Sequence, residues 1–216
     1  MLRKRSLIGY KLFKDVSREL TLAQTLEVPV SQRFHDALSY ASTLHRTQRR
    51  KGTTIPYIAH LLAVASIVME AGGSEDEAIA ALLHDGPEDQ GGEKTLADIR
   101  KRFGDAVADI VSNCSDTFED PKPAWTERKR KYIQHLRSAD AGTLLVSCAD
   151  KLHNARATLR DLRDQGASVW NRFSATREQT LGNYVGLIEA YENATPDPRR
   201  TGIVRELRDI VAQMSR

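Results

Sequence analysis

Long hydrophobic runs are absent from this chain of 216 residues, and so is any framework of cysteines. No segment approaches the roughly 18 consecutive apolar residues of a membrane-spanning helix, so we expect no contact with a membrane. The basic N-terminus has neither a long apolar core nor a small-residue cleavage site, so we expect no signal peptide. Cys114 and Cys148 lie in apolar-periodic stretches and are expected to be small core residues, neither disulfide partners nor thiolate ligands. A reducing cytoplasm is the simplest compartment for such a chain.

A basic domain surface is missing as well, although the net charge is +3. Residues 1–20 hold six Lys or Arg and two acids, so the rest of the chain has a net charge of −1. Nucleic-acid-binding domains usually carry their basic residues on the folded surface. We therefore expect no nucleic-acid partner. Residues 1–30 form a partly basic N-terminal extension, which could be a solvated arm, a weak contact with an anionic surface or an oligomer contact.

Strand signals are scarce, and apolar residues recur at helical spacing almost throughout. Apolar residues make up 40% and charged residues 28% of the chain, which is typical of a globular protein. We predict an all-α, single-domain helical bundle, with a core over residues 31–195 and a C-terminal helix, 196–216, packed on it. Helices are expected at 32–48, 57–71, 75–83, 95–103, 107–114, 125–136, 141–164, 174–193 and 199–214.

Two capping boxes indicate where helices begin. Ser74 is followed three positions later by Glu77, and Thr95 and Asp98 repeat the same signature. In each case an apolar-periodic run follows. We expect Ser74 and Thr95 to be N-caps, and Gly104 to end the second of these helices.

The segment 82–89, Leu-Leu-His-Asp-Gly-Pro-Glu-Asp, is the most informative part of the sequence. Adjacent helical residues project about 100° apart, so His84 and Asp85 can approach one divalent ion from neighbouring directions. The acidic pair that follows could move protons beside that ion. A charged helix end is the simpler alternative. Because proline lacks a backbone donor and disfavours α geometry at the residue before it, this helix should end or kink at Gly86.

Two other residues complete a candidate metal shell. His60 and Asp150 would add to His84 and Asp85, giving two imidazoles and two carboxylates. That donor set suits Mn, Fe or Zn, and ligand type alone does not choose among them. Fewer than six protein ligands leave coordination positions for water and substrate. Taken singly, His60 could equally be a core histidine, and Asp150 an N-cap or an ion-pair partner.

These residues lie within a longer pattern that keeps one order along the chain. It comprises Arg49–Gly52 leading to Pro56–His60, Ala80–Asp85 with Glu88 and Asp89, Phe103-Gly104 with Val107-Ala108, and Ala149–Arg156. In this pattern the chain resembles the HD superfamily of metal-dependent phosphohydrolases. Within it, the chain is most similar to the hydrolase domain of the RelA/SpoT family and to stand-alone small alarmone hydrolases. The resemblance covers residues 32–165 or so.

The resemblance implies an HD-type helical bundle with 3′-pyrophosphohydrolase activity. In that family a manganese ion is held by the residues that match His60, His84, Asp85 and Asp150. Water on the metal attacks the 3′-diphosphate of guanosine tetra- or pentaphosphate, and pyrophosphate and GDP or GTP are released. A cation suits this chemistry because it lowers the pKa of bound water and offsets phosphoryl charge.

The resemblance also implies roles beyond the metal shell. Glu88 and Asp89 match an acidic pair that orients the nucleophile and moves protons. Arg50 and Lys51 match a basic pair near the phosphates, and two cations are what a diphosphate needs. Asn154 matches a nucleoside-contacting position. The simpler alternatives are a solvated helix end for the acids and a solvated loop for the basic pair.

Some positions depart from the family pattern. Leu61 stands where a proline often follows the metal histidine, and Ala157 where a threonine is common. Substrate preference could therefore have moved, for example toward adenosine alarmones. Two other functions stay open: a different nucleotide phosphohydrolase, such as a nucleotidase, and a nucleotide-binding regulator without catalysis. The sequence is compatible with a homo-oligomer.

Overall fold

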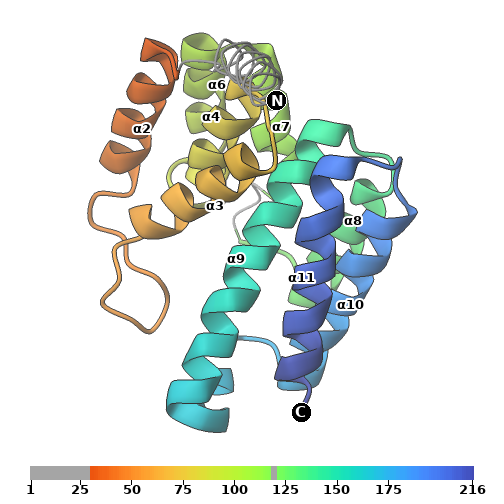
Figure 1. Cartoon of the computed structure of the whole chain (residues 1–216). Coiled ribbons are helices and arrows are strands. Elements are labelled where there is room, and N and C mark those ends of the chain that lie inside the picture. The colour runs from red at the N-terminus through yellow and green to blue at the C-terminus, as the bar shows by residue number, and fades with distance from the viewer. Residues whose placement is uncertain (1–29, 118–120) are drawn as a thin grey trace, which may run out of the picture. The chain divides into compact units, whose positions relative to one another are not determined.

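The computed structural model describes residues 30–117 and 121–216, and the regular elements in these ranges are helical (Figure 1). The described part contains no strand, only an isolated bridge between Arg49 and Pro56. The all-α prediction is confirmed. The helices are α2 (Gln32–Leu44), α3 (Ile58–Glu70), α4 (Glu75–Leu83), α5 (Gly86–Asp89), α6 (Gly92–Phe103), α7 (Asp105–Cys114), α8 (Trp125–Leu136), α9 (Ala141–Gln165), the 3₁₀ helix η2 (Gly166–Arg172), α10 (Arg177–Asn193) and α11 (Pro198–Met214).

Residues Gln32–Arg216 form one compact unit, and α9 is its central element. This 25-residue helix packs against α3, α4 and α7 on one side and against α10 and α11 on the other (Figure 1). Leu145 and Leu152 of α9 are almost completely buried. Burying each such side chain contributes about 1.5–3 kcal/mol. The core is therefore continuous along α9, which places the polar residues of that helix between two packed layers.

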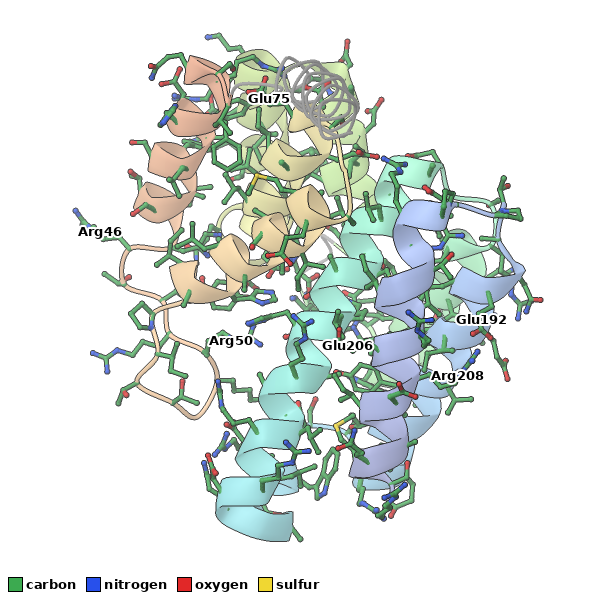
Figure 2. All side chains as sticks on the ribbon, viewed as in Figure 1. Arg46, Arg50, Glu75, Glu192, Glu206 and Arg208 are labelled. Carbon is green, nitrogen blue, oxygen red and sulfur yellow. The ribbon has the colours of Figure 1, made fainter. Side chains whose placement is uncertain are left out.

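Ion pairs on the surface join α11 to its neighbours. Arg156 of α9 donates from Nε and Nη2 to Glu206 of α11, at 2.7 and 2.8 Å. Arg208 of α11 pairs with Glu192 of α10 (Figure 2). The division of this unit at residue 196, into a core and a separate C-terminal helix, stays a prediction. Most of the expected N-terminal extension, residues 1–29, lies outside the described residues.

The capping prediction is confirmed at one site and wrong at the other. Ser74 Oγ accepts from the backbone N–H of Glu77, whose carboxylate accepts in turn from the backbone N–H of Ser74. Thr95, by contrast, lies inside α6, and its hydroxyl donates to the carbonyl oxygen of Gln90 at 2.6 Å. The N-cap lies four residues earlier, at Gly91, whose φ of 118° makes the turn that starts the helix.

The helix break at Gly86 is confirmed. Helix α4 ends at Leu83, and α5 begins at Gly86 with a proline in its first turn. His84 and Asp85 therefore lie at the junction of two helices. Gly104 ends α6 as predicted, and Gly166 ends α9; both glycines have positive φ.

Other boundaries differ from the predictions by a few residues. The first helix ends at Leu44 instead of residue 48, and α10 begins at Arg177 instead of residue 174. Cys114 and Cys148 are buried and unpaired, as predicted. Among the described residues, no helix is both long and apolar enough to cross a membrane.

Candidate metal centre and its cavity

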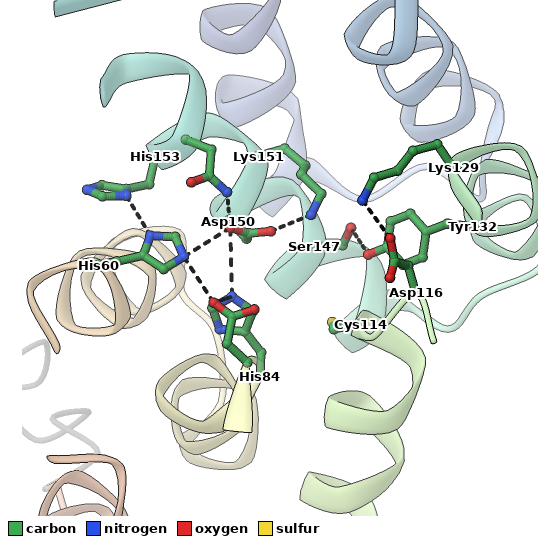
Figure 3. A network of polar contacts seen from close by, with 12 residues as sticks. His60, His84, Cys114, Asp116, Lys129, Tyr132, Ser147, Asp150, Lys151 and His153 are labelled. Carbon is green, nitrogen blue, oxygen red and sulfur yellow. Dashed lines mark hydrogen bonds and ion pairs between the residues drawn. The ribbon is translucent and has the colours of Figure 1, made fainter. Parts of the chain in front are cut away.

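Residues from three regions of the chain converge at one buried point. His60 comes from α3, His84 from the α4–α5 junction and Asp150 from α9, and their ligand atoms lie within 4.8 Å of one another (Figure 3). Asp85 joins them, with its Oδ2 3.4 Å from His60 Nε2 and 3.2 Å from His84 Nε2. The structure therefore brings together all four residues that the sequence singled out as candidate ligands.

The two histidines are oriented as metal ligands would be. The Nδ1 atom of His84 lies 2.8 Å from the carbonyl oxygen of Ala81, and that of His60 lies 2.7 Å from Nδ1 of His153. Both Nε2 atoms are buried and have no well-aligned hydrogen bond, yet they lie 3.2 Å (His60) and 3.7 Å (His84) from Asp150 Oδ1. Ligating histidines typically use one ring nitrogen for the ion and the other for a supporting hydrogen bond. The cluster fits a divalent metal.

The electrostatics of the cluster favour a cation. Burial alone would raise the pKa of Asp85, but the neighbouring imidazoles of His84 and His60 hold it well below its usual range. For Asp150, burial is likewise outweighed, chiefly by Lys151, whose Nζ donates to Asp150 Oδ2 at 2.5 Å. Burial opposes the charged form of His84, yet the two carboxylates raise its pKa well above the ordinary value. Two buried, ionised carboxylates require compensating positive charge.

The two residues of the acidic pair point in different directions. Asp89 is exposed and lines the cavity described below, where its Oδ2 accepts from Gln48 Nε2 at 2.8 Å. Glu88 accepts from Lys122 Nζ at 2.9 Å and does not line that cavity. Burial and the charge of Asp116 raise the pKa of Glu88.

A cavity of about 580 Å³ opens beside the cluster, and His60 lies in its wall. Its lining is strongly basic, since seven Lys or Arg residues face only two carboxylates. The cations are Arg49, Arg50, Lys51, Lys129, Lys151, Arg160 and Arg172, and the acids are Asp89 and Asp161. A cavity with such an excess of positive charge attracts a polyanion.

The three predicted substrate-binding residues, Arg50, Lys51 and Asn154, all line this cavity. Arg50 points from the loop before α3 toward α9, where its Nη2 donates to Asn154 Oδ1 (Figure 2). Asn154 Nδ2 donates in turn to Asp150 Oδ1 at 2.5 Å. One hydrogen-bond chain therefore links a cation of the cavity to a candidate metal ligand.

Several polar residues of the site were not singled out from the sequence. The hydroxyl of Tyr57 donates to Asp85 Oδ2 at 2.7 Å, and burial together with the charge of Asp85 raises its pKa, so it stays a donor. Tyr57 lies one helical turn before His60, a spacing that could have indicated a shared face. Asp116 holds Lys129 at 2.6 Å (Figure 3). No local signal predicts that contact, because the two residues belong to different segments.

His153 acts as a supporting residue in this geometry. Besides its contact with His60, it lies in the cavity wall. Burial and the neighbouring charge of His60 lower the pKa of His153 to about 4. It is therefore neutral at physiological pH and able to form a hydrogen bond with an imidazole.

The sequence and the fold both match a known family. A model of the HD domain family matches residues 37–181, and the chain belongs to this family. A Xenopus tropicalis protein named guanosine-3′,5′-bis(diphosphate) 3′-pyrophosphohydrolase MESH1 is 39% identical over 139 residues, which is 63% of this chain and 73% of the relative. The Homo sapiens protein of the same name is 38% identical over 141 residues, with the same shares of each chain covered.

A solved structure supports the same assignment. It is described as a metazoan ortholog of SpoT that hydrolyzes ppGpp and plays a role in starvation responses. It superposes with a TM-score of 0.67 at 28% identity and covers 85% of this chain and 96% of the other. The resemblance to the HD superfamily and to SpoT-type hydrolases is confirmed.

Proposed function

We propose that this protein is a metal-dependent hydrolase that removes the 3′-diphosphate of (p)ppGpp, giving pyrophosphate and GDP or GTP. The observation that carries the proposal is the placement of a buried His–Asp cluster beside a cavity lined by seven cations. The names of the MESH1 relatives and the ppGpp hydrolysis by the structural neighbour support the substrate class.

In this proposal His60, His84, Asp85 and Asp150 hold the metal, which we take to be Mn²⁺. When bound, a divalent ion lowers the pKa of a coordinated water and offsets charge on the phosphoryl oxygens. Burial of the cluster keeps bulk water away from the reacting phosphate. The Nδ1 contacts of the two histidines fix their rings, so that both Nε2 atoms stay directed at the same point.

The other predicted residues bind substrate and move protons. Arg50 and Lys51 hold the 3′-diphosphate, and Asn154 contacts the nucleoside while it orients Arg50 and Asp150. Asp89 accepts a proton from the attacking water, a role that its position in the cavity wall and its hydrogen bond from Gln48 support. Glu88, the other member of the acidic pair, assists proton movement from beside Asp89 on α5, and burial together with the charge of Asp116 raises its pKa, which favours a carboxyl that can carry a proton.

The test uses purified full-length protein with Mn²⁺ and a panel of guanosine and adenosine 3′- and 5′-phosphates, with products identified by ³¹P NMR and ion-exchange chromatography. Release of pyrophosphate from the 3′ position of ppGpp supports the proposal. Orthophosphate from mononucleotides would show a nucleotidase instead, and tight binding without turnover would show a regulator. Preference for the adenosine analogue would support the same 3′-pyrophosphohydrolase reaction with adenine in place of guanine as the base.

A variant pair ties this activity to the cluster. Asp85→Asn should lower kcat about 100-fold or more, as expected for the loss of a charged ligand. Asp98→Asn, which alters a half-buried carboxylate paired with Arg102 on α6, should retain full activity. Full activity of Asp85→Asn would refute the proposed metal shell.

The buried, unpaired cysteines also suit a reducing cytoplasm, which we propose as the compartment.

A further inference from the structure

One face of α9 follows the cavity from the metal cluster to its outer end. Asp150, Asn154, Ala157, Thr158 and Asp161 recur at three- and four-residue spacing and so share a helix face, and the last four line the cavity. At a rise of 1.5 Å per residue, Asp161 lies about 16 Å beyond Asp150 along the axis. The cavity is therefore a long trough whose wall on α9 begins beside a metal ligand.

A second group of cations lies at the outer end of this trough. Asp161 accepts from Arg172 Nη1 at 2.7 Å on one carboxylate oxygen and from Arg160 at 3.3 Å on the other. Arg172 also donates to Gln165, which fixes it further. We call Arg160 and Arg172, with the Asp161 that holds them, the distal cluster. It carries an excess of positive charge and reaches the cavity from two elements, α9 and η2.

The loop that carries Arg50 and Lys51 closes over the distal cluster. The aliphatic part of Arg172 lies against Gly52, where an added Cβ would come within 2.8 Å of Arg172 Cδ. Gly52 also has a φ of 71°, a region that favours glycine. The same loop carries Arg50, which bonds to Asn154 one helical turn beyond the metal ligand Asp150. The loop therefore contacts α9 near the metal cluster and also contacts the distal cluster.

The middle of the trough differs from both ends. Between Asp150 and the distal cluster, the α9 face presents the amide of Asn154, the small side chain of Ala157 and the hydroxyl of Thr158, and none of them is charged. Cationic groups therefore flank the stretch of Ala157 and Thr158, with Arg50 bonded to Asn154 on the inner side and the distal cluster on the outer side. This arrangement matches a nucleoside that bears one diphosphate at each end. Guanidinium groups suit the outer diphosphate, because they bind phosphate oxygens in a bidentate manner.

We propose that Arg160 and Arg172 form a second anion subsite, which takes the 5′-diphosphate of the nucleotide whose 3′-diphosphate lies at the metal cluster. This inference rests on the proposed function and deepens it. Arg160 is exposed and makes only 3.3 Å contacts, so it is free to turn toward a phosphate. Arg172 keeps unused donors beyond the two that bind Asp161 and Gln165. The subsite contributes to substrate binding and leaves the bond-breaking step unchanged.

The experiment compares two substrates, ppGpp and guanosine 3′-diphosphate, which lacks any 5′-phosphate. With ppGpp, Arg160→Gln should raise KM about three- to tenfold with kcat unchanged, the range for one partly exposed charge-assisted contact. With guanosine 3′-diphosphate the same variant should have the KM of the wild type. Arg172→Lys keeps the positive charge but loses the bidentate guanidinium group. It should likewise raise KM for ppGpp and leave KM for guanosine 3′-diphosphate unchanged.

Arg163→Gln is the matched control. It removes the same charge from the same helix, but Arg163 bonds to Gln213 and lies outside the trough, so both substrates should behave as with the wild type. Equal KM changes for the two substrates, or none for either, would overturn the subsite while the hydrolase stands. Failure of the wild type to hydrolyse ppGpp with any divalent metal would instead refute the proposed function, and the subsite with it.

Discussion

Removing one hydroxyl group should weaken the metal centre without disturbing the nucleotide cavity. In Tyr57→Phe, Asp85 Oδ2 loses the hydrogen bond that it accepts at 2.7 Å. The ring stays in place, so that its stacking on His45 and the guanidinium of Arg50, 5.5 Å from the ring centre, are preserved. The substitution therefore separates the support of a candidate metal ligand from the binding of phosphate.

The size of the effect follows from the geometry. A hydrogen bond to a charged group is worth about 1.5–3 kcal/mol, and loss of a group that supports a metal ligand typically costs 10- to 100-fold in affinity or activity. Asp85 keeps its contacts with His60 and His84 in the variant. We therefore expect the lower end of the range, about tenfold weaker Mn²⁺ binding, which corresponds to about 1.4 kcal/mol.

The assay is a metal titration read in two ways, as hydrolysis of ppGpp and as the rise in melting temperature with added Mn²⁺. Tyr57→Phe should shift both midpoints about tenfold, while KM for the nucleotide at saturating metal stays within about twofold of the wild type. Tyr40→Phe is the control, because its hydroxyl lies against Asp98 and not against the cluster. An unchanged metal midpoint in Tyr57→Phe would refute the reasoning, as would an equal shift in Tyr40→Phe.

Two further predictions concern stability, measured by chemical unfolding. Asp116 is buried, and Lys129 and Arg128 lower its pKa against the opposing effect of burial, so Asp116→Asn should cost about 2–4 kcal/mol at pH 7. Because this carboxyl has its lower pKa in the folded state, the difference from the wild type should be constant above about pH 5 and shrink below about pH 4. A difference that grows on acidification would contradict the assignment. Leu145→Ala should cost about 2–5 kcal/mol and lower Tm by roughly 10 °C, whereas Leu62→Ala, at a side chain 44% exposed, should cost under about 1 kcal/mol; similar losses in both would refute the core placement.

Local patterns predicted the fold well because helices depend on short-range spacing. The helical spacing of apolar residues over 141–164 can be recognised from neighbouring residues alone, and α9 was predicted to within one residue at its C-terminal end. The capping box at Ser74 is equally local. The failure at Thr95 has a local cause as well: two successive glycines at 91 and 92, both with positive φ, start the helix earlier than the capping signature suggested.

Contacts between distant segments could not be predicted in the same way. Arg172 is 120 positions from Gly52 in the sequence, and only the fold shows that they touch. Gln48 and Asp89 are 41 positions apart, yet they form a hydrogen bond in the wall of the cavity. Such contacts depend on packing angles that composition and periodicity do not encode, so the supporting residues of the site appear only in three dimensions.

The break at Gly86 keeps the candidate ligands His84 and Asp85 together and separates the directions of the two acids that follow. His84 and Asp85 both keep α-type backbone angles, with φ and ψ of −58° and −32° for His84 and of −91° and −6° for Asp85. The side chains of these two residues meet at 3.2 Å, between His84 Nε2 and Asp85 Oδ2. After the break, the single turn of α5 carries both acids. Asp89 lies in the cavity wall, and Glu88 forms an ion pair with Lys122. A substitution at Gly86 should consequently act on the acids proposed to transfer protons before it acts on the candidate metal shell, because that shell is anchored by α3 and α9 as well as by this junction.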